Sequence, residues 1–213
     1  LVTSAIDGAI DRYDTLNNFP RVMQQIGFDA ETSRKAIQRL SDGVKGLPTT
    51  LDSVAKTTQR IAVMTGDLDG AVETTLALNN AFLASGASAA DARRGLEQYV
   101  QMLATGKVDA HSWQTLQETM GMALNDVAKA FGFAGRSAQN DLYKALKDGR
   151  ITFDEFNEKL IELSNQTGGF ADRARAATGG IRTAVTIMKT AVVRGVTDII
   201  DAIDKVLSKT RFK

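Results

Sequence analysis

Residues 106–113 read GKVDAHSW, and residues 149–156 repeat the same pattern as GRITFDEF. Each copy runs glycine, cation, β-branched apolar residue, N-cap residue, two variable positions, a polar residue and a large aromatic residue. Glycine commonly ends one helix, and an N-cap side chain accepts hydrogen bonds from the free amides that start the next. The pattern therefore predicts two sharp corners between helices. The corner residues are Gly106, Val108, Asp109, Trp113, Gly149, Ile151, Thr152, Glu155 and Phe156.

The apolar residues of each corner predict a hydrophobic staple, in which the residue before the cap packs against the fourth helical residue. Val108 would pair with Trp113, and Ile151 with Phe156. Thr152 and Glu155 also have the spacing of a capping box. These features indicate packed helices rather than a ligand site.

The composition favours an all-α protein. The 213 residues include 2 prolines and 6% aromatic residues, and no segment alternates between apolar and polar residues as a strand would. The chain has 0 cysteines, which excludes disulfides and thiolate metal sites. It has neither an apolar run long enough to span a bilayer nor a visible signal peptide. It begins with Leu1 rather than methionine, so we expect a piece of a longer protein.

Helix signals recur along the whole chain. The first helix is expected over about residues 3–16, with a break at the sequence NNFP of residues 17–20. A later helix is expected to break near Gly121. Predicted N-caps are Asp29, Asp67, Ser88, Asp109, Ser137 and Thr152. We therefore expect a compact bundle of short capped helices, followed by one long amphipathic helix.

That long helix is expected over about residues 181–207, where apolar residues recur at steps of three and four, close to a coiled-coil seam. Two uses remain open, namely packing back onto the bundle and association with sister copies. The candidate self-association seam comprises Ile181, Val185, Met188, Val192, Val196, Ile199 and Ile203. Residues 171–213 carry nine Lys/Arg and four Asp, although the net charge of the whole chain is only +1. This polarity fits a solvated helix end, or an acidic partner.

No residue pattern indicates catalysis, so we predict no catalytic, cofactor-binding or metal-binding residues and no cofactor. His111 is the only histidine and has no nucleophile motif beside it. The carboxylate pairs Asp67/Asp69 and Asp154/Glu155 fall at helix starts, where acids favour the helix dipole. A glycosidase pair is the less favoured interpretation of these acids.

Residues 148–155 resemble half of an EF-hand loop, but two of the positions that should ligate calcium are Lys144 and Leu146. We therefore do not predict a calcium site. The basic residues near the end of the chain are spread out and lack stacking aromatics, so no nucleic-acid binding is expected.

Three stretches resemble the tape measure domain of phage and prophage tail tape measure proteins. The first is GKVDAHSWQTL at 106–116 with MALNDVAKAFG at 122–132, and the second is DLYKALKDGRIT at 141–152. The third is GGFA at 168–171 with the helix after residue 180. With residues 57–86, the resemblance spans about residues 40–200. Residues 117–121 depart from it, because a joint richer in glycine and proline is expected there.

The resemblance implies a structural protein that sets tail-tube length during assembly. It implies a helical tape measure domain over residues 1–178, with an internal boundary near residue 105, and the start of an extended helical region over 179–213. Implied partners are tube, chaperone and tip proteins, with sister copies through the C-terminal helix. The implied location is the phage tail, reached through the host cytoplasm during assembly.

Three alternatives stay open at this point. One is a helical interaction or scaffold module unrelated to phage, and another is a cell-wall hydrolase domain. The third is a membrane-active segment over 181–207, which Asp198, Asp201 and Asp204 oppose. We expect no stable membrane insertion.

Overall fold

The computed structural model describes residues 2–178 and 181–210, with side chains at residues 6–178, 188–202 and 204–205. Within these ranges the chain forms helices and no strand, which confirms the predicted all-α class. The helices are α1 (Val2–Ile26), α2 (Ala30–Gly43), α3 (Leu51–Thr65), α4 (Leu68–Ala84), α5 (Ala89–Thr105), α6 (Ala110–Ala130), α7 (Ala138–Lys147), α8 (Phe153–Asn165), α9 (Phe170–Ala177) and α10 (Ile181–Thr210).

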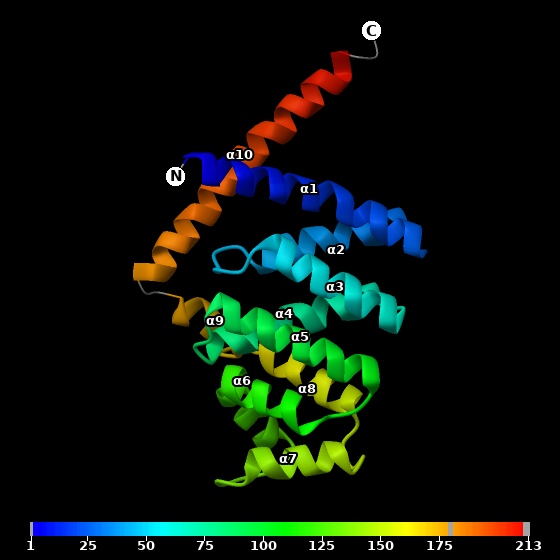
Figure 1. Ribbon diagram of the computed structural model, residues 1–213, viewed down its shortest axis with the longest axis vertical. Coiled ribbons are helices and arrows are strands. Elements are labelled where there is room, and N and C mark those ends of the chain that lie inside the picture. The colour runs from blue at the N-terminus through cyan, green and yellow to red at the C-terminus, as the bar shows by residue number, and fades with distance from the viewer. Residues whose placement is uncertain (1, 179–180, 211–213) are drawn as a thin grey trace. The chain divides into compact units, whose positions relative to one another are not determined.

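The helices pack as two compact units. Unit 1 consists of residues 1–55 and 180–213, and unit 2 consists of residues 56–179. The chain thus returns at its end to the unit in which it began (Figure 1). The predicted functional boundaries, at residues 178/179 and near 105, stay predictions.

In unit 1, α1 packs on α2 and crosses α10 (Figure 1). The predicted break at residues 17–20 is wrong, because α1 continues through Pro20 to Ile26. Proline costs about 3 kcal/mol inside a helix because it lacks an N–H and crowds the preceding turn. Phe19, Pro20 and Met23 are all buried, so packing offsets this cost.

In unit 2, α4 is the central helix and packs against α5, α6, α8 and α9. Its sequence is rich in alanine, leucine and small polar residues on every side, which is typical of a helix that is buried all round. Its buried polar side chains have partners. Thr75 accepts from Thr58 at 3.0 Å, and Asn80 donates to Ser164 at 3.4 Å.

Most helix starts lie where the sequence predicts them. Asp29, Asp67 and Ser88 each accept a hydrogen bond from an amide of the following first turn. The prediction for Ser137 is wrong, since its side chain makes no capping bond. Its backbone is already helical (φ −89°, ψ −5°), whereas a capping residue is extended. The short helix α9 was not predicted.

Candidate functional site

The first predicted corner joins α5 to α6. Gly106 ends α5 in the left-handed conformation (φ 62°), which glycine adopts without strain. The amide of Ser112 donates to Asp109 Oδ1 at 2.9 Å. Hydrogen bonds from Ser112 lower the pKa of Asp109, because they stabilise its charged form. These conformations and contacts, which define the corner, thus all lie within the seven residues 106–112.

The second corner joins α7 to α8 in the same way. Gly149 has φ 72°, and Thr152 begins α8 with a complete capping box. The amide of Glu155 donates to Thr152 Oγ1 at 3.2 Å, and the amide of Thr152 donates to Glu155 Oε2 at 2.7 Å. This bond from the Thr152 amide lowers the pKa of Glu155.

The capping box makes the stability of the chain depend on pH. The folded pKa of Glu155 lies below its ordinary value of 4.5, so its contribution is full above pH 4.5 and is lost as the pH falls through the folded value. Glu155→Gln keeps an acceptor for the Thr152 amide but does not titrate. We expect the wild type to be more stable than this variant at pH 7 and to lose that advantage progressively as the pH falls below 4.5.

Urea unfolding at pH 7 and pH 3, followed by Trp113 fluorescence, measures this difference. Glu158→Gln is the matched control, since Glu158 is an exposed glutamate on the same helix. This variant removes the same charge from α8 but leaves the capping box intact. An equal advantage of the wild type over Glu155→Gln at pH 7 and pH 3 would contradict the assignment.

The structure brings the aromatic residues of the two corners together. The rings of Trp113 and Phe156 lie 6.4 Å apart, edge to face, inside the core of unit 2. Val108 and Ile151 are half-buried and pack against the same core. Trp113 and Phe156 are 3% and 0% exposed, so neither lines an open cleft. The arrangement fixes the angles between helices and offers no reacting group.

The same core contains a series of side-chain hydrogen bonds that the sequence did not predict. The hydroxyl of Tyr99 donates to Asn157 Oδ1 at 2.7 Å, and Asn157 Nδ2 donates to Thr74 Oγ1 at 2.8 Å. Burial raises the pKa of Tyr99, so it stays a neutral donor. These residues are 58 and 83 positions apart in sequence. No local pattern could have predicted their contact.

The helix α6 is bent at Met120, where the backbone leaves the helical region (φ −138°, ψ 34°). This matches the break that was predicted near Gly121. Two polar groups beside the bend are held by other helices or their caps. The carbonyl of Gly121 accepts from Gln139 Nε2 at 2.9 Å, and the amide of Ala123 donates to Ser85 Oγ at 3.3 Å.

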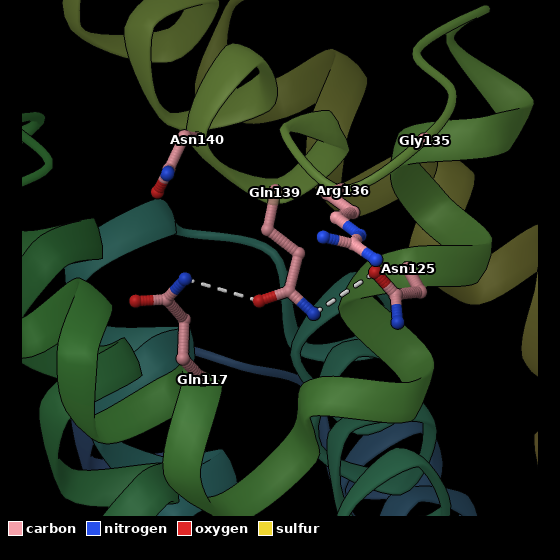
Figure 2. Close-up of a pocket in the computed structure, with 6 residues that line it drawn as sticks. All are labelled: Gln117, Asn125, Gly135, Arg136, Gln139 and Asn140. Carbon is pink, nitrogen blue, oxygen red and sulfur yellow. Dashed lines mark hydrogen bonds between the residues drawn. The ribbon is translucent and has the colours of Figure 1, made fainter.

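Gln139 also connects the two halves of the bent helix (Figure 2). Its Oε1 accepts from Gln117 at 3.0 Å, and its Nε2 donates to Asn125 Oδ1 at 3.0 Å. These side chains line an open cavity of about 340 Å³ together with Gly135, Arg136 and Asn140. The lining is amides and one guanidinium, without a carboxylate or a nucleophile. The hydrogen bonds among the lining residues therefore hold the bend in α6, and the lining contains no acid–base pair.

Gln139→Ala removes all three of these hydrogen bonds. We expect it to lower the stability of unit 2 by about 1–2 kcal/mol and to speed amide exchange around residues 121–125. Urea unfolding and hydrogen exchange with mass spectrometry provide the two measurements. Asn140→Ala is the control, because Asn140 lines the same cavity but makes none of these bonds. Equal exchange in the two variants would show that Gln139 does not hold the bend.

Unit 1 contains the C-terminal helix with its predicted seam. Met188, Val192 and Ile199 are 63%, 49% and 61% exposed, and Val196 is half-buried. The side chains of Ile181, Val185 and Ile203 lie outside the described residues. The seam therefore stays a prediction. In the described part of the helix, Val193 and Thr197, which lie outside the seam, contact α1.

The crossing of α10 with α1 is close and partly polar. Val193 lies against Gly8, and the hydroxyl of Thr197 donates to the carbonyl of Ala9 at 3.1 Å. Arg194 donates to the carbonyl of Ser41 at 2.5 Å, in the last turn of α2. A cation is favourable there because the carbonyl end of a helix carries partial negative charge.

Arg12 also reaches this point, where it donates to Ser41 Oγ at 2.6 Å. Its pKa is lowered to about 10, first by burial and then by the nearby charge of Arg194. Asp42 and Asp198 partly offset these effects. The two arginines thus tie α1 and α10 to the end of α2.

Other candidate chemistry finds no support in the described part of the chain. Across the residues whose positions are described, no three histidine, cysteine or acidic side chains gather as metal ligands would. A search of the same residues finds no helix with the length and apolar character of a membrane span. Asp67 and Glu155, from the two acidic pairs, act as helix-start residues.

The comparisons with known proteins bear on the chain as a whole. The family model described as tape measure protein matches residues 7–201. Neither the curated proteins nor the solved structures include a match to this sequence. The matched range covers both corners, the bent helix and most of α10. The chain therefore belongs to the tape measure protein family, whose members are structural proteins of phage tails.

Proposed function

We propose that residues 1–178 form the folded head of the tape measure protein and that residues 179–213 begin its extended helical part. The match to the family over residues 7–201 carries this proposal. It is supported by the 30-residue length of α10, the longest helix described. Because α10 packs on α1, the extended part would begin at a fixed position on unit 1.

An extended helix suits a ruler because its length follows directly from the number of residues. Each residue adds about 1.5 Å, so α10 alone spans about 45 Å. The folded part has a different task, because its corners and bends hold helices at set angles. In this role the head anchors the ruler, and the extended part measures the tube.

The partners in this proposal are the other proteins of the tail. Tube subunits surround the extended part, chaperones hold it before assembly, and tip proteins receive one end. Sister copies associate through α10. The protein meets these partners in the host cytoplasm and remains in the completed tail.

The chain acts in this proposal without catalysing a reaction. The corner aromatics are buried, and acids of the two candidate pairs stabilise helix starts. Incubating the chain with purified cell wall tests this point. Release of soluble fragments that is lost on changing a single carboxylate would contradict it.

Insertions in the parent gene test the ruler directly. A helical insertion of about 60 residues directly after α10 should lengthen the tail by about 90 Å, as measured by electron microscopy. The same insertion in the loop at residues 132–135, between α6 and α7, should leave tail length unchanged. Assembled tails of unchanged length after the first insertion would contradict the ruler. Lengthening after the second would contradict the division into head and ruler.

A further inference from the structure

The cavity beside the bend of α6 contains polar groups that the fold itself does not use. All of its lining residues belong to unit 2, namely Gln117, Asn125, Gly135, Arg136, Gln139 and Asn140. Gln139 uses both its oxygen and its nitrogen to hold the bend. Within the described part of the chain, the side chains of Arg136 and Asn140 form no hydrogen bond or ion pair. These two side chains are therefore available to a ligand.

The hydrogen bonds along the lining run in one direction. Gln117 Nε2 donates to Gln139 Oε1 at 3.0 Å, and Gln139 Nε2 donates to Asn125 Oδ1 at 3.0 Å. A side-chain amide has an acceptor oxygen and a donor nitrogen. The series therefore leaves an acceptor unused at one end, Gln117 Oε1, and a donor unused at the other, Asn125 Nδ2.

Arg136 strengthens the donor end. In the view of Figure 2, Arg136 and Asn125 lie on one side of Gln139, whereas Gln117 and Asn140 lie on the other. The guanidinium of Arg136 is positive and carries several N–H donors, and no carboxylate lines the cavity to neutralise it. The cavity thus has a positive end with donors and a neutral end with amide oxygens.

The start of α7 adds positive charge to the wall of the cavity. Ser137 does not cap this helix, so the partial positive charge of its first amides is left without a capping oxygen. Asp141 is the acidic residue of that turn, but it does not line the cavity. The helix start therefore favours the same kind of ligand as Arg136, namely an anion.

We propose that the cavity binds the C-terminal end of a peptide chain from a second protein. The terminal carboxylate lies at the positive end, where the Arg136 guanidinium donates to both oxygens and Asn125 Nδ2 donates to one of them. A backbone N–H of the same peptide donates to Gln117 Oε1. The bonds through Gln139 hold Asn125 and Gln117 in place before the ligand arrives, which lowers the entropy cost of binding. The site is separate from the ruler proposed for residues 179–213.

Two features favour a chain end over other anions. A chain end joins a carboxylate to backbone N–H groups, and these match the two ends of the lining. A phosphate ion is compact and has no second group to reach the amide end. The cavity of about 340 Å³ is also small among ligand sites. It therefore suits the end of a chain better than an acidic side chain, whose backbone continues on both sides.

Two-dimensional NMR of the isotope-labelled 213-residue chain tests the proposal. Acetyl-triglycine, which has a free carboxylate, is titrated into the millimolar range, because a site open to water binds a short peptide weakly. It should shift the side-chain amide signals of Asn125 and Asn140 in a saturable way. Acetyl-triglycine amide lacks the charge and should shift these signals little at the same concentrations.

Two further probes distinguish the source of the anion. One is a short peptide with an internal glutamate and both ends blocked, and the other is inorganic phosphate. Each should bind at least about tenfold more weakly than acetyl-triglycine, because each lacks one of the two matched groups in the right place.

Two variants test the donor end. Arg136→Gln should weaken binding of acetyl-triglycine by about tenfold or more. Asn125→Asp keeps an acceptor for Gln139 but replaces the free donor with a charged oxygen, so it should abolish binding. Both side chains are exposed, and thermal melting checks that both variants fold. Arg93→Gln is the matched control, because Arg93 is an exposed arginine of α5 that does not line the cavity. It should bind like the wild type.

Each outcome bears on one part of the assignment. No saturable shift with acetyl-triglycine, or an equal shift with its amide, would overturn the cavity as a binding site. Equally tight binding of phosphate or of the glutamate peptide would overturn the chain end as its ligand. Unchanged binding by Arg136→Gln or Asn125→Asp would place the peptide elsewhere. None of these results depends on tail length, so the ruler function stands or fails separately.

Discussion

Replacing Phe156 with alanine is expected to lower the free energy of unfolding of unit 2 by about 3–5 kcal/mol. The side chain is 0% exposed and belongs to the main hydrophobic core. It packs between aromatic neighbours, with ring centres 6.4 Å from Trp113 and 6.3 Å from Tyr99. Truncation removes these contacts and leaves a cavity that surrounding helices cannot close without moving the second corner.

Trp113 is the only tryptophan and lies in the same core, so its fluorescence reports the unfolding of unit 2 during a urea titration. Phe133→Ala is the control, because Phe133 is only half-buried at the edge of that core. The control should cost clearly less. A loss below about 1 kcal/mol for Phe156→Ala would mean that the second corner does not organise the core.

The second large effect concerns a glycine whose substitution should raise helix propensity but lower stability. A Cβ on Gly95 would lie 2.3 Å from Cε1 and 2.4 Å from Cζ of Phe82, and 3.0 Å from Oγ1 of Thr119. Phe82 is 0% exposed and belongs to the main hydrophobic core, so its ring can move only by displacing other core side chains. Gly95→Ala should therefore destabilise unit 2 by about 1–3 kcal/mol, although alanine gains up to about 1 kcal/mol in an unpacked helix.

Gly195→Ala is the matched control, because it makes the same change inside a helix but in open space. It should raise the stability of unit 1 by up to about 1 kcal/mol. Urea unfolding followed by Trp113 fluorescence measures the first variant, and thermal melting followed by helical circular dichroism measures the second. If Gly95→Ala is stabilised like Gly195→Ala, Gly95 does not lie as close to Phe82 as the structure shows.

Helix starts could be predicted from sequence because their contacts are local. Asp29, Asp109 and Thr152 each accept a hydrogen bond from an amide two or three residues further along the chain. The residues that form such a bond therefore lie within one helical turn of each other in the sequence. Ser137 has the same residue type, but its helical backbone keeps its side chain from capping. Residue type alone could not reveal that conformation.

The continuity of α1 could not be predicted for a different reason. A proline within a helix has a local cost that the sequence reveals, whereas the burial of Phe19, Pro20 and Met23 that offsets it arises only from tertiary packing. The bend in α6 is an intermediate case. Its approximate place could be predicted, but the groups that hold it, Ser85 and Gln139, come from other parts of unit 2.

The sequence by itself determined the helical class, most helix starts, the two corners and the resemblance to tape measure proteins. Each of these depends on residues within about one or two helical turns, or on an ordered set of such short patterns. Only the tertiary structure decided which faces are covered. Thr197 reaches Ala9 across 188 positions, and Tyr99 reaches Asn157 across 58. Periodicity in α10 shows that apolar residues share a side, but only the docking of Val193 on Gly8 shows which side is left free.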